Sequence, residues 1–141
     1  MMNREKAINV TWLLLRFSSA LMFFQAGAMK MFGWFGGMPG SNGATASLTT
    51  QIGVGGLLEV VGGVLIMFGL CTRPVAFILS GEMAVAYWQF HAPGGTWPII
   101  NHGGEAVLYC FLFLFMSAYG GGAYSLDALI CRKRSGPRTT R

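Results

Sequence analysis

The chain has 141 residues, of which 53% are hydrophobic and only 11% are charged, with a net charge of +5 and a mean hydropathy of +0.52. Because a soluble domain carries roughly a quarter charged residues, this chain has too few charges to cover a water-exposed surface, and its apolar content excludes a disordered chain. The length suits one compact domain. These values predict an integral membrane protein.

Four segments have the length and apolar character of a membrane-spanning helix, which needs about 20 mostly apolar residues. They cover residues 9–35, 51–70, 74–90 and 101–119. Pro74 is expected in the first turn of the third segment, where its missing N–H leaves nothing unsatisfied. The stretches 36–50 and 91–102 contain Gly and Pro at several positions and are expected to be loops. We therefore predict an all-α fold, a membrane-spanning four-helix bundle.

The C-terminal part follows directly on the fourth segment. Residues 124–129 are expected to form a short interfacial helix capped by Ser125. A basic tail on a soluble protein would suggest a nucleic-acid partner, but next to a hydrophobic segment it is better interpreted as a juxtamembrane anchor, so no nucleic acid is expected. We divide the chain into a single four-helix transmembrane domain, residues 1–130, and a basic cytoplasmic tail, residues 131–141.

The distribution of Lys and Arg predicts the orientation. With four spans, both termini lie on one side together with the turn at residues 71–73, and that side holds eight of the ten basic residues. The positive-inside rule places the termini in the cytoplasm and the chain in the cell (inner) membrane as a multi-pass protein. A cleaved signal peptide is the alternative for the first segment. It is disfavoured because Arg16 interrupts the apolar run.

The three cysteines predict no external disulfide. Cys71 and Cys131 are expected on the cytoplasmic side and Cys110 inside the fourth helix. Because none faces the oxidising side and no CxxC motif is present, we interpret them as small apolar packing residues.

Five ionisable residues fall inside the predicted spans: Arg16, Lys30, Glu59, Glu82 and Glu105. Such groups are expensive at membrane depth and normally face the bundle interior in pairs. From helical spacing and depth we expect Arg16 to pair with Glu82, with Glu59 within reach of Arg16. We also expect Lys30 to pair with Glu105. Two cations and three carboxylates leave one carboxylate unpaired, able to hold a proton or contact a ligand.

Two interpretations of these charges stay open: they fix the register of the helices, or they form a ligand or proton site. His91 and His102, at the rim of the outer loop, are candidate ligands for haem or a metal. Since no third ligand is evident, interfacial hydrogen bonding is favoured and no metal site is expected.

Seven short stretches, taken together, resemble the DoxX family of small four-helix membrane proteins. They are residues 14–16 (LLR), 25–33 (QAGAMKMFG), 56–63 (GLLEVVGG), 69–76 (GLCTRPVA), 83–87 (MAVAY), 101–105 (NHGGE) and 124–127 (YSLD). The resemblance covers about residues 14–128. The family's polar positions fall on Arg16, Lys30, Glu59, Glu105 and Asp127.

The resemblance implies a function in membrane redox chemistry. Family members are linked to quinone-coupled sulfur oxidation, as a subunit of thiosulfate:quinone oxidoreductase, and to complexes that handle oxidative or thiol stress. The chain has no flavin, haem, iron–sulfur or nicotinamide motif of its own, so in redox chemistry a partner protein or a bound quinone would supply the electron carrier. A bound quinone is expected to be held by Lys30 or Arg16 and protonated through Glu59 or Glu105.

We therefore expect an accessory subunit of a quinone-linked redox complex in the lipid bilayer. The alternative is a structural subunit or assembly factor that packs against other membrane proteins or a second copy of itself. A small transporter is disfavoured because four helices leave little room for alternating access.

Overall fold

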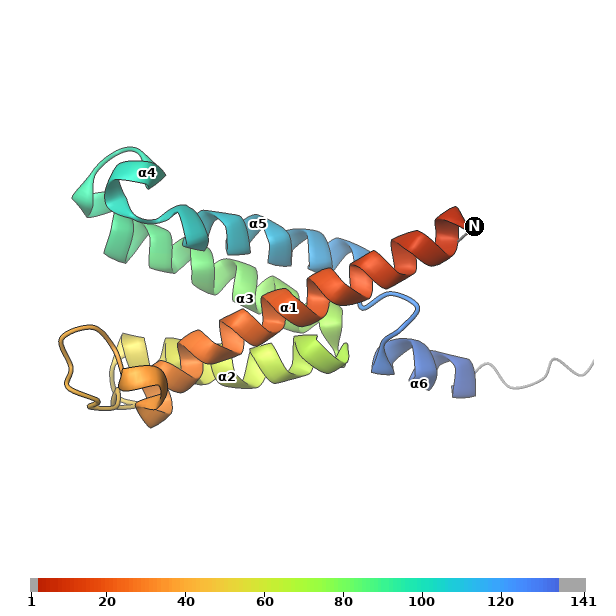
Figure 1. Cartoon of the computed structure of the whole chain (residues 1–141), viewed down its shortest axis with the longest axis horizontal. Coiled ribbons are helices and arrows are strands. Elements are labelled where there is room, and N and C mark those ends of the chain that lie inside the picture. Colours follow the sequence, from red (N-terminus) through yellow and green to blue (C-terminus); the bar gives the residue numbers. More distant parts are fainter. Residues whose placement is uncertain (1–2, 135–141) are drawn as a thin grey trace, which may run out of the picture.

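The structure is a computed structural model that describes residues 3–134, and this part of the chain contains helices and no strands (Figure 1). The all-α prediction is confirmed. In chain order the helices are α1 (Arg4–Phe32), α2 (Gln51–Phe68), α3 (Thr72–Ala86), α4 (Pro98–Asn101), α5 (Gly104–Tyr119) and α6 (Leu126–Arg134).

The four long helices are arranged as two pairs. Helix α1 packs mainly on α2, and α3 packs mainly on α5, while contacts between α2 and α3 join the pairs. Figure 1 shows the α1–α2 pair diverging from the α3–α5 pair toward the end that carries the two long loops. Helix α6 lies at the opposite end, with the N-terminus.

A glycine brings α1 and α2 close together. A Cβ atom on Gly27 would lie 2.7 Å from the backbone nitrogen of Val60 and 2.8 Å from the carbonyl oxygen of Gly56. Only a residue without a side chain fits between these backbones. The side chains of α1 that follow Gly27 are thereby held against α2, and Lys30 is one of them.

The third segment begins two residues earlier than expected, and Pro74 is confirmed in the first turn of α3. The helix continues without a break into a π-helical turn, Tyr87–His91. The expectation that residues 91–102 lack helix is wrong. They contain a 3₁₀ turn, Ala92–Gly94, and the single turn of α4, which Pro98 can open because a proline at the start of a helix loses no hydrogen bond.

The end of the chain agrees with the expectation of a short capped helix. The Ser125 Oγ accepts a hydrogen bond from the Ala128 N–H at 3.2 Å, and α6 extends to Arg134. The first residues of the predicted tail are therefore helical. The rest of that tail, residues 135–141, lies outside the described residues.

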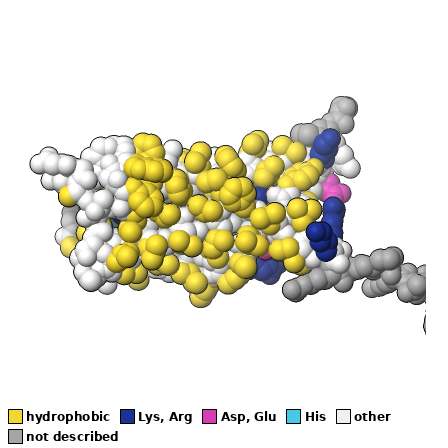
Figure 2. All heavy atoms as spheres, turned by 90° about the horizontal axis from the view of Figure 1, so that it is seen from below, with side chains coloured by type: hydrophobic (Ala, Val, Ile, Leu, Met, Phe, Trp, Pro, Cys, Tyr) yellow, Lys and Arg dark blue, Asp and Glu magenta, His cyan; other side chains and the backbone are white. Residues whose placement is uncertain are grey.

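The exterior is apolar. Large hydrophobic side chains are exposed along all the long helices, and Figure 2 shows them as a continuous surface, with Lys and Arg gathered at one end. By length and composition α1 and α2 each suffice to cross a membrane, and α5 is a shorter apolar helix. The count of four spans and the side of the termini stay predictions.

Candidate functional site

Arg16 is 1% exposed and bonds to backbone oxygens. Its Nη1 donates to the carbonyls of Ile66 at 2.5 Å and Met67 at 2.7 Å, and its Nη2 donates to the carbonyl of Tyr124 at 2.7 Å. The last carbonyls of a helix lack partners within the helix, and the C-terminal end carries partial negative charge. Arg16 therefore caps the end of α2 and ties the segment before α6 to it.

The expected contacts of Arg16 with Glu82 and Glu59 are wrong. Glu59 lies seven residues before Ile66 on α2, which is about 10 Å along the helix. Residue depth predicts contacts between side chains but not contacts with backbone carbonyls. The carbonyls at the end of α2 become available where Gly69 ends the helix with φ +67°.

Asp127 adds a second set of contacts at the end of the bundle where Arg16 caps α2. Its Oδ1 accepts from the Cys71 N–H and its Oδ2 from the Thr72 N–H, both at 2.8 Å, so one carboxylate caps the N-terminus of α3. The Asp127 N–H donates to the Gly69 carbonyl at 2.9 Å. The turn between α2 and α3 is thus fixed by side chains from α1 and α6.

Lys30, the second cation of α1, pairs with a carboxylate. Its Nζ lies 2.5 Å from Glu59 Oε1, with 26% of the lysine side chain and 4% of the glutamate side chain exposed. Lys30 follows the close contact at Gly27, and Glu59 faces it from α2. The expected Lys30–Glu105 pair is wrong, because Lys30 bonds to Glu59 on α2.

Glu82 on α3 joins this pair. Its carboxylate interacts electrostatically with Glu59 and Lys30, and its Oε1 would lie only 3.1 Å from a Cβ on Gly55. The absence of a side chain on Gly55 therefore makes room for the carboxylate. We call Lys30, Glu59 and Glu82 the charge cluster.

The charge cluster has one cation and two carboxylates. Within the described part of the chain, Glu59 Oε2 and Glu82 Oε2 are buried with no hydrogen-bond partner. An unsatisfied buried polar atom lowers stability, and it often has a functional reason. The cluster can therefore accept a proton or a hydrogen-bond donor from a ligand.

A pair of glutamines lies between the cluster and the loop end of the bundle. The Gln51 side-chain amide donates to Gln89 Oε1. Gln51 precedes Gly55 and Glu59 at helical spacing on α2, and both glutamines are exposed. They extend the polar face of α2 and α3 from the cluster toward the loops. The spacing of Gln51 and Glu59 is visible in the sequence, but the predicted site contained only ionisable side chains.

Glu105 is exposed in the first turn of α5. An acidic residue there complements the positive end of the helix dipole. The structure separates it from the charge cluster, which contains three of the five ionisable candidates.

The two histidines do not come together at a ligand site. His91 Nδ1 lies 3.1 Å from the Asn101 carbonyl oxygen, and His102 is exposed with φ +56° at the end of α4. Asn101, which was not singled out from the sequence, organises this loop. Its side chain donates to the Gly95 carbonyl at 2.8 Å and accepts from the Gly103 N–H at 2.8 Å. No three His, Cys, Asp or Glu residues among those described are placed to hold a metal.

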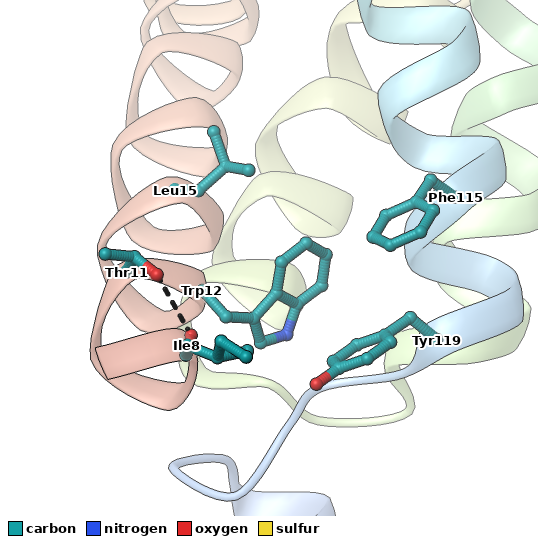
Figure 3. A pocket seen from close by; sticks show the side chains of 6 residues that line it. All are labelled: Ile8, Thr11, Trp12, Leu15, Phe115 and Tyr119. Carbon is teal, nitrogen blue, oxygen red and sulfur yellow. Dashed lines mark hydrogen bonds between the residues drawn. The ribbon is translucent and has the colours of Figure 1, made fainter. Parts of the chain in front are cut away.

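An apolar groove separates α1 from α5 near the N-terminus. Figure 3 shows Trp12 pointing from α1 toward Phe115 and Tyr119 of α5, with ring centroids 5.4 Å and 4.8 Å apart. The groove has a volume of about 340 Å³, and Ile8, Thr11 and Leu15 complete its lining. The Thr11 hydroxyl donates to the Ala7 carbonyl at 2.9 Å. With no charged residue in its lining, the groove suits apolar contact and not proton chemistry.

Comparison with known proteins identifies the family. A model of the DoxX family matches residues 11–92, which is more than half of the chain. The chain belongs to the DoxX family. It is thus a membrane protein whose apolar exterior contacts lipid.

Two relatives from Haemophilus influenzae agree with this assignment. One is 40% identical over 94% of this chain and all of its own length, and the other is 30% identical over 86% of this chain and 83% of its own length. Both are described only as uncharacterized proteins, so neither brings an activity to this DoxX chain. No solved structure was found to match it.

Proposed function

We propose that this DoxX protein is an accessory subunit of a quinone-linked redox complex in the cell inner membrane, and that its charge cluster contacts the quinone headgroup. The observation that carries the proposal is the pair of buried carboxylate oxygens, on Glu59 and Glu82, that have no hydrogen-bond partner among the described residues. Two carboxylates face one lysine, so one carboxylate has no cation of its own. The excess is suited to proton handling inside a membrane.

The residues present fit a quinone. A quinone is a carrier of two electrons and two protons that dissolves in the bilayer, and its carbonyl oxygens accept hydrogen bonds. Lys30 Nζ has three N–H donors, of which one is directed at Glu59, and its side chain keeps some exposure. Lys30 therefore has donors left for a carbonyl oxygen, while Glu59 and Glu82 provide two carboxylates beside it that can take up or release a proton.

The glutamine pair supports proton access to the cluster. Gln51 and Gln89 are exposed at the loop end of α2 and α3. Together with Glu82 they provide polar side chains from the membrane surface inward. The electrons come from the redox cofactor of a partner protein, because the chain carries no such motif of its own.

The proposal includes the orientation. Helical backbone over residues 72–91 amounts to about 30 Å at the usual rise, which spans a bilayer core. The end with α6 and the α2–α3 turn carries basic residues, whereas residues 33–50 and 92–104 contain no Lys or Arg. The positive-inside rule then places both termini in the cytoplasm after four spans.

Labelling of single cysteines tests this orientation. In a background with Cys71, Cys110 and Cys131 replaced by serine, Ser41→Cys and Gly95→Cys should react with an impermeant reagent added to spheroplasts. Arg132→Cys should react only after lysis. Labelling at position 132 in sealed spheroplasts would contradict four spans with cytoplasmic termini.

Quinone content tests the functional proposal. Wild type, Lys30→Met and the control Glu105→Gln are purified in mild detergent, and the quinone bound per chain is measured by extraction and mass spectrometry. A hydrogen bond from a charged donor contributes about 1.5–3 kcal/mol, so Lys30→Met should weaken quinone binding by at least tenfold. Glu105→Gln should bind like wild type.

Absence of quinone from the wild-type protein, together with no binding of added quinone, would reject the redox role. The second candidate would then gain weight: a structural subunit or assembly factor. Its support is Gly81, an exposed position of α3 where a Cβ would meet nothing within 4 Å, so that a helix of another membrane protein has room to approach closely. Proteins that copurify with the chain would distinguish the two.

A further inference from the structure

Helix α6 has an apolar face that is not buried against the bundle. Leu126, Leu129 and Ile130 share one face at helical spacing, and they are 39%, 54% and 43% exposed. Arg132 and Lys133 follow in the last turn. Together these five residues line an open hollow of about 450 Å³.

The position of α6 is fixed by polar contacts and not by this face. The Asp127 N–H bonds to the Gly69 carbonyl, and the Asp127 carboxylate bonds to the N-terminus of α3. Arg16 holds the Tyr124 carbonyl just before the helix. The contacts of α6 with the bundle thus leave Leu126, Leu129 and Ile130 available for another partner.

The surroundings of α6 indicate what covers that face. The helix lies at the end that carries the N-terminus and the α2–α3 turn (Figure 1). In Figure 2 the cationic side chains gather at this end, directly beside the apolar exterior. An apolar stripe beside a cationic edge matches the boundary between acyl chains and headgroups in a leaflet with anionic lipid.

We propose that α6 binds an anionic phospholipid of the adjacent leaflet. An acyl chain lies along Leu126, Leu129 and Ile130, while Arg132 and Lys133 contact the phosphate. Helix α6 extends outward from the end of the bundle (Figure 1). Arg16 and Asp127 connect this part of the chain to the ends of α2 and α3. The inference is independent of quinone binding, because it concerns the opposite end of the bundle.

A fluorescent label on the apolar face tests this binding in the full chain. Bimane is attached to Leu129→Cys in a background with the three native cysteines replaced by serine. The protein is placed in phosphatidylcholine vesicles of two kinds. One kind contains phosphatidylglycerol with brominated acyl chains, and the other contains phosphatidylcholine with brominated acyl chains. Brominated phosphatidylglycerol should quench the label more strongly than brominated phosphatidylcholine. In a second protein, Cys131 is kept as the single cysteine and carries the label. This position is about half a turn away on the helix, and its label should be quenched by neither lipid.

Charge variants then test the headgroup contact. Each Lys or Arg at the surface of an anionic membrane changes binding roughly 5-fold, so Arg132→Gln with Lys133→Gln should lower the preference for phosphatidylglycerol at position 129 by about 25-fold. Arg4→Gln with Lys6→Gln removes the same charge from α1 and should leave that preference unchanged. Both variants alter exposed side chains, and unchanged melting temperatures verify that they fold.

Three outcomes would overturn the inference. Equal quenching by the two lipids would mean that α6 contacts any acyl chain without selecting a headgroup. No quenching at position 129 would mean that the face is not in the membrane, and crosslinking through position 129 between chains would assign it to a second copy. An equal loss of preference in both charge variants would show a general surface potential and no site on α6.

Discussion

Helix α1 carries two cations fourteen residues apart, the buried Arg16 and the partly buried Lys30, and the protein provides different partners for them. Arg16 bonds to three backbone carbonyls, two at the end of α2 and one just before α6. Lys30 bonds to Glu59, with a second carboxylate, Glu82, in electrostatic reach. The hydrogen-bond acceptors of Arg16 are backbone carbonyls, with the Asp127 carboxylate in electrostatic reach, whereas the acceptor of Lys30 is a side chain that can gain or lose a proton. The first arrangement is suited to holding helices together and the second to chemistry.

The largest effect is expected at Arg16. Arg16→Gln removes three hydrogen bonds that a charged group donates, and a bond of this kind contributes about 1.5–3 kcal/mol. We expect the free energy of unfolding to fall by about 4 kcal/mol in total. The measurement is the melting temperature in detergent, which should drop strongly, or the protein should not be recovered in monodisperse form. Arg4→Gln, an exposed arginine of the same helix, is the matched control and should behave as wild type. Equal stability of the two variants would mean that the carbonyl contacts contribute little.

A smaller and asymmetric effect is expected at the Lys30–Glu59 pair. Lys30→Met leaves a buried carboxylate without its cation and should lower stability by about 3 kcal/mol. Glu59→Gln should lower it by less, because the partly exposed lysine can extend its ammonium toward water.

The double variant Lys30→Met with Glu59→Gln should recover part of the lost stability, because the effects of substitutions at two residues in contact do not add. Thermal unfolding in detergent gives the stability of the two single variants and of the double variant, and Glu105→Gln is the control substitution of a carboxylate. Strict additivity would show that the ion pair does not stabilise the fold.

Asp127→Asn should lower stability by about 1 kcal/mol, because the amide can cap only one of the two N–H groups at the start of α3. Asp127→Ala should lower it further. Melting temperatures of the two variants give the comparison, and an alanine variant as stable as wild type would show that α6 is not needed to fix the turn.

The smallest effect is expected at the cysteines. Cys71 and Cys131 are exposed and Cys110 is partly buried, so the triple serine variant should lose no more than about 1 kcal/mol and remain a compact species in size-exclusion chromatography. Loss of the folded protein would reveal a packing role for Cys110 beside Ser80, whose hydroxyl donates to the Cys110 carbonyl.

The sequence was sufficient to predict the long helices and α6, but not the short helical turns between residues 91 and 102 or the partners of the helices. Apolar segments, Pro74 and the Ser125 cap mark helix positions through local chemistry, and these predictions agree with the structure. Pairing of charges depends on which helices touch. Spacing shows that Arg16 and Lys30 lie on one face of α1, yet it does not say that this face meets α2. Nor does it reveal backbone acceptors, so Arg16 was assigned a carboxylate that belongs to the other cation.

The variant Glu82→Gln tests most directly whether the charge cluster is functional or structural. Glu82 Oε2 has no hydrogen-bond partner among the described residues, so the neutral side chain should keep or raise the melting temperature. Quinone affinity, titrated by quenching of tryptophan fluorescence, should fall at least tenfold relative to wild type and to Glu105→Gln. An unchanged quinone affinity in Glu82→Gln would contradict the account.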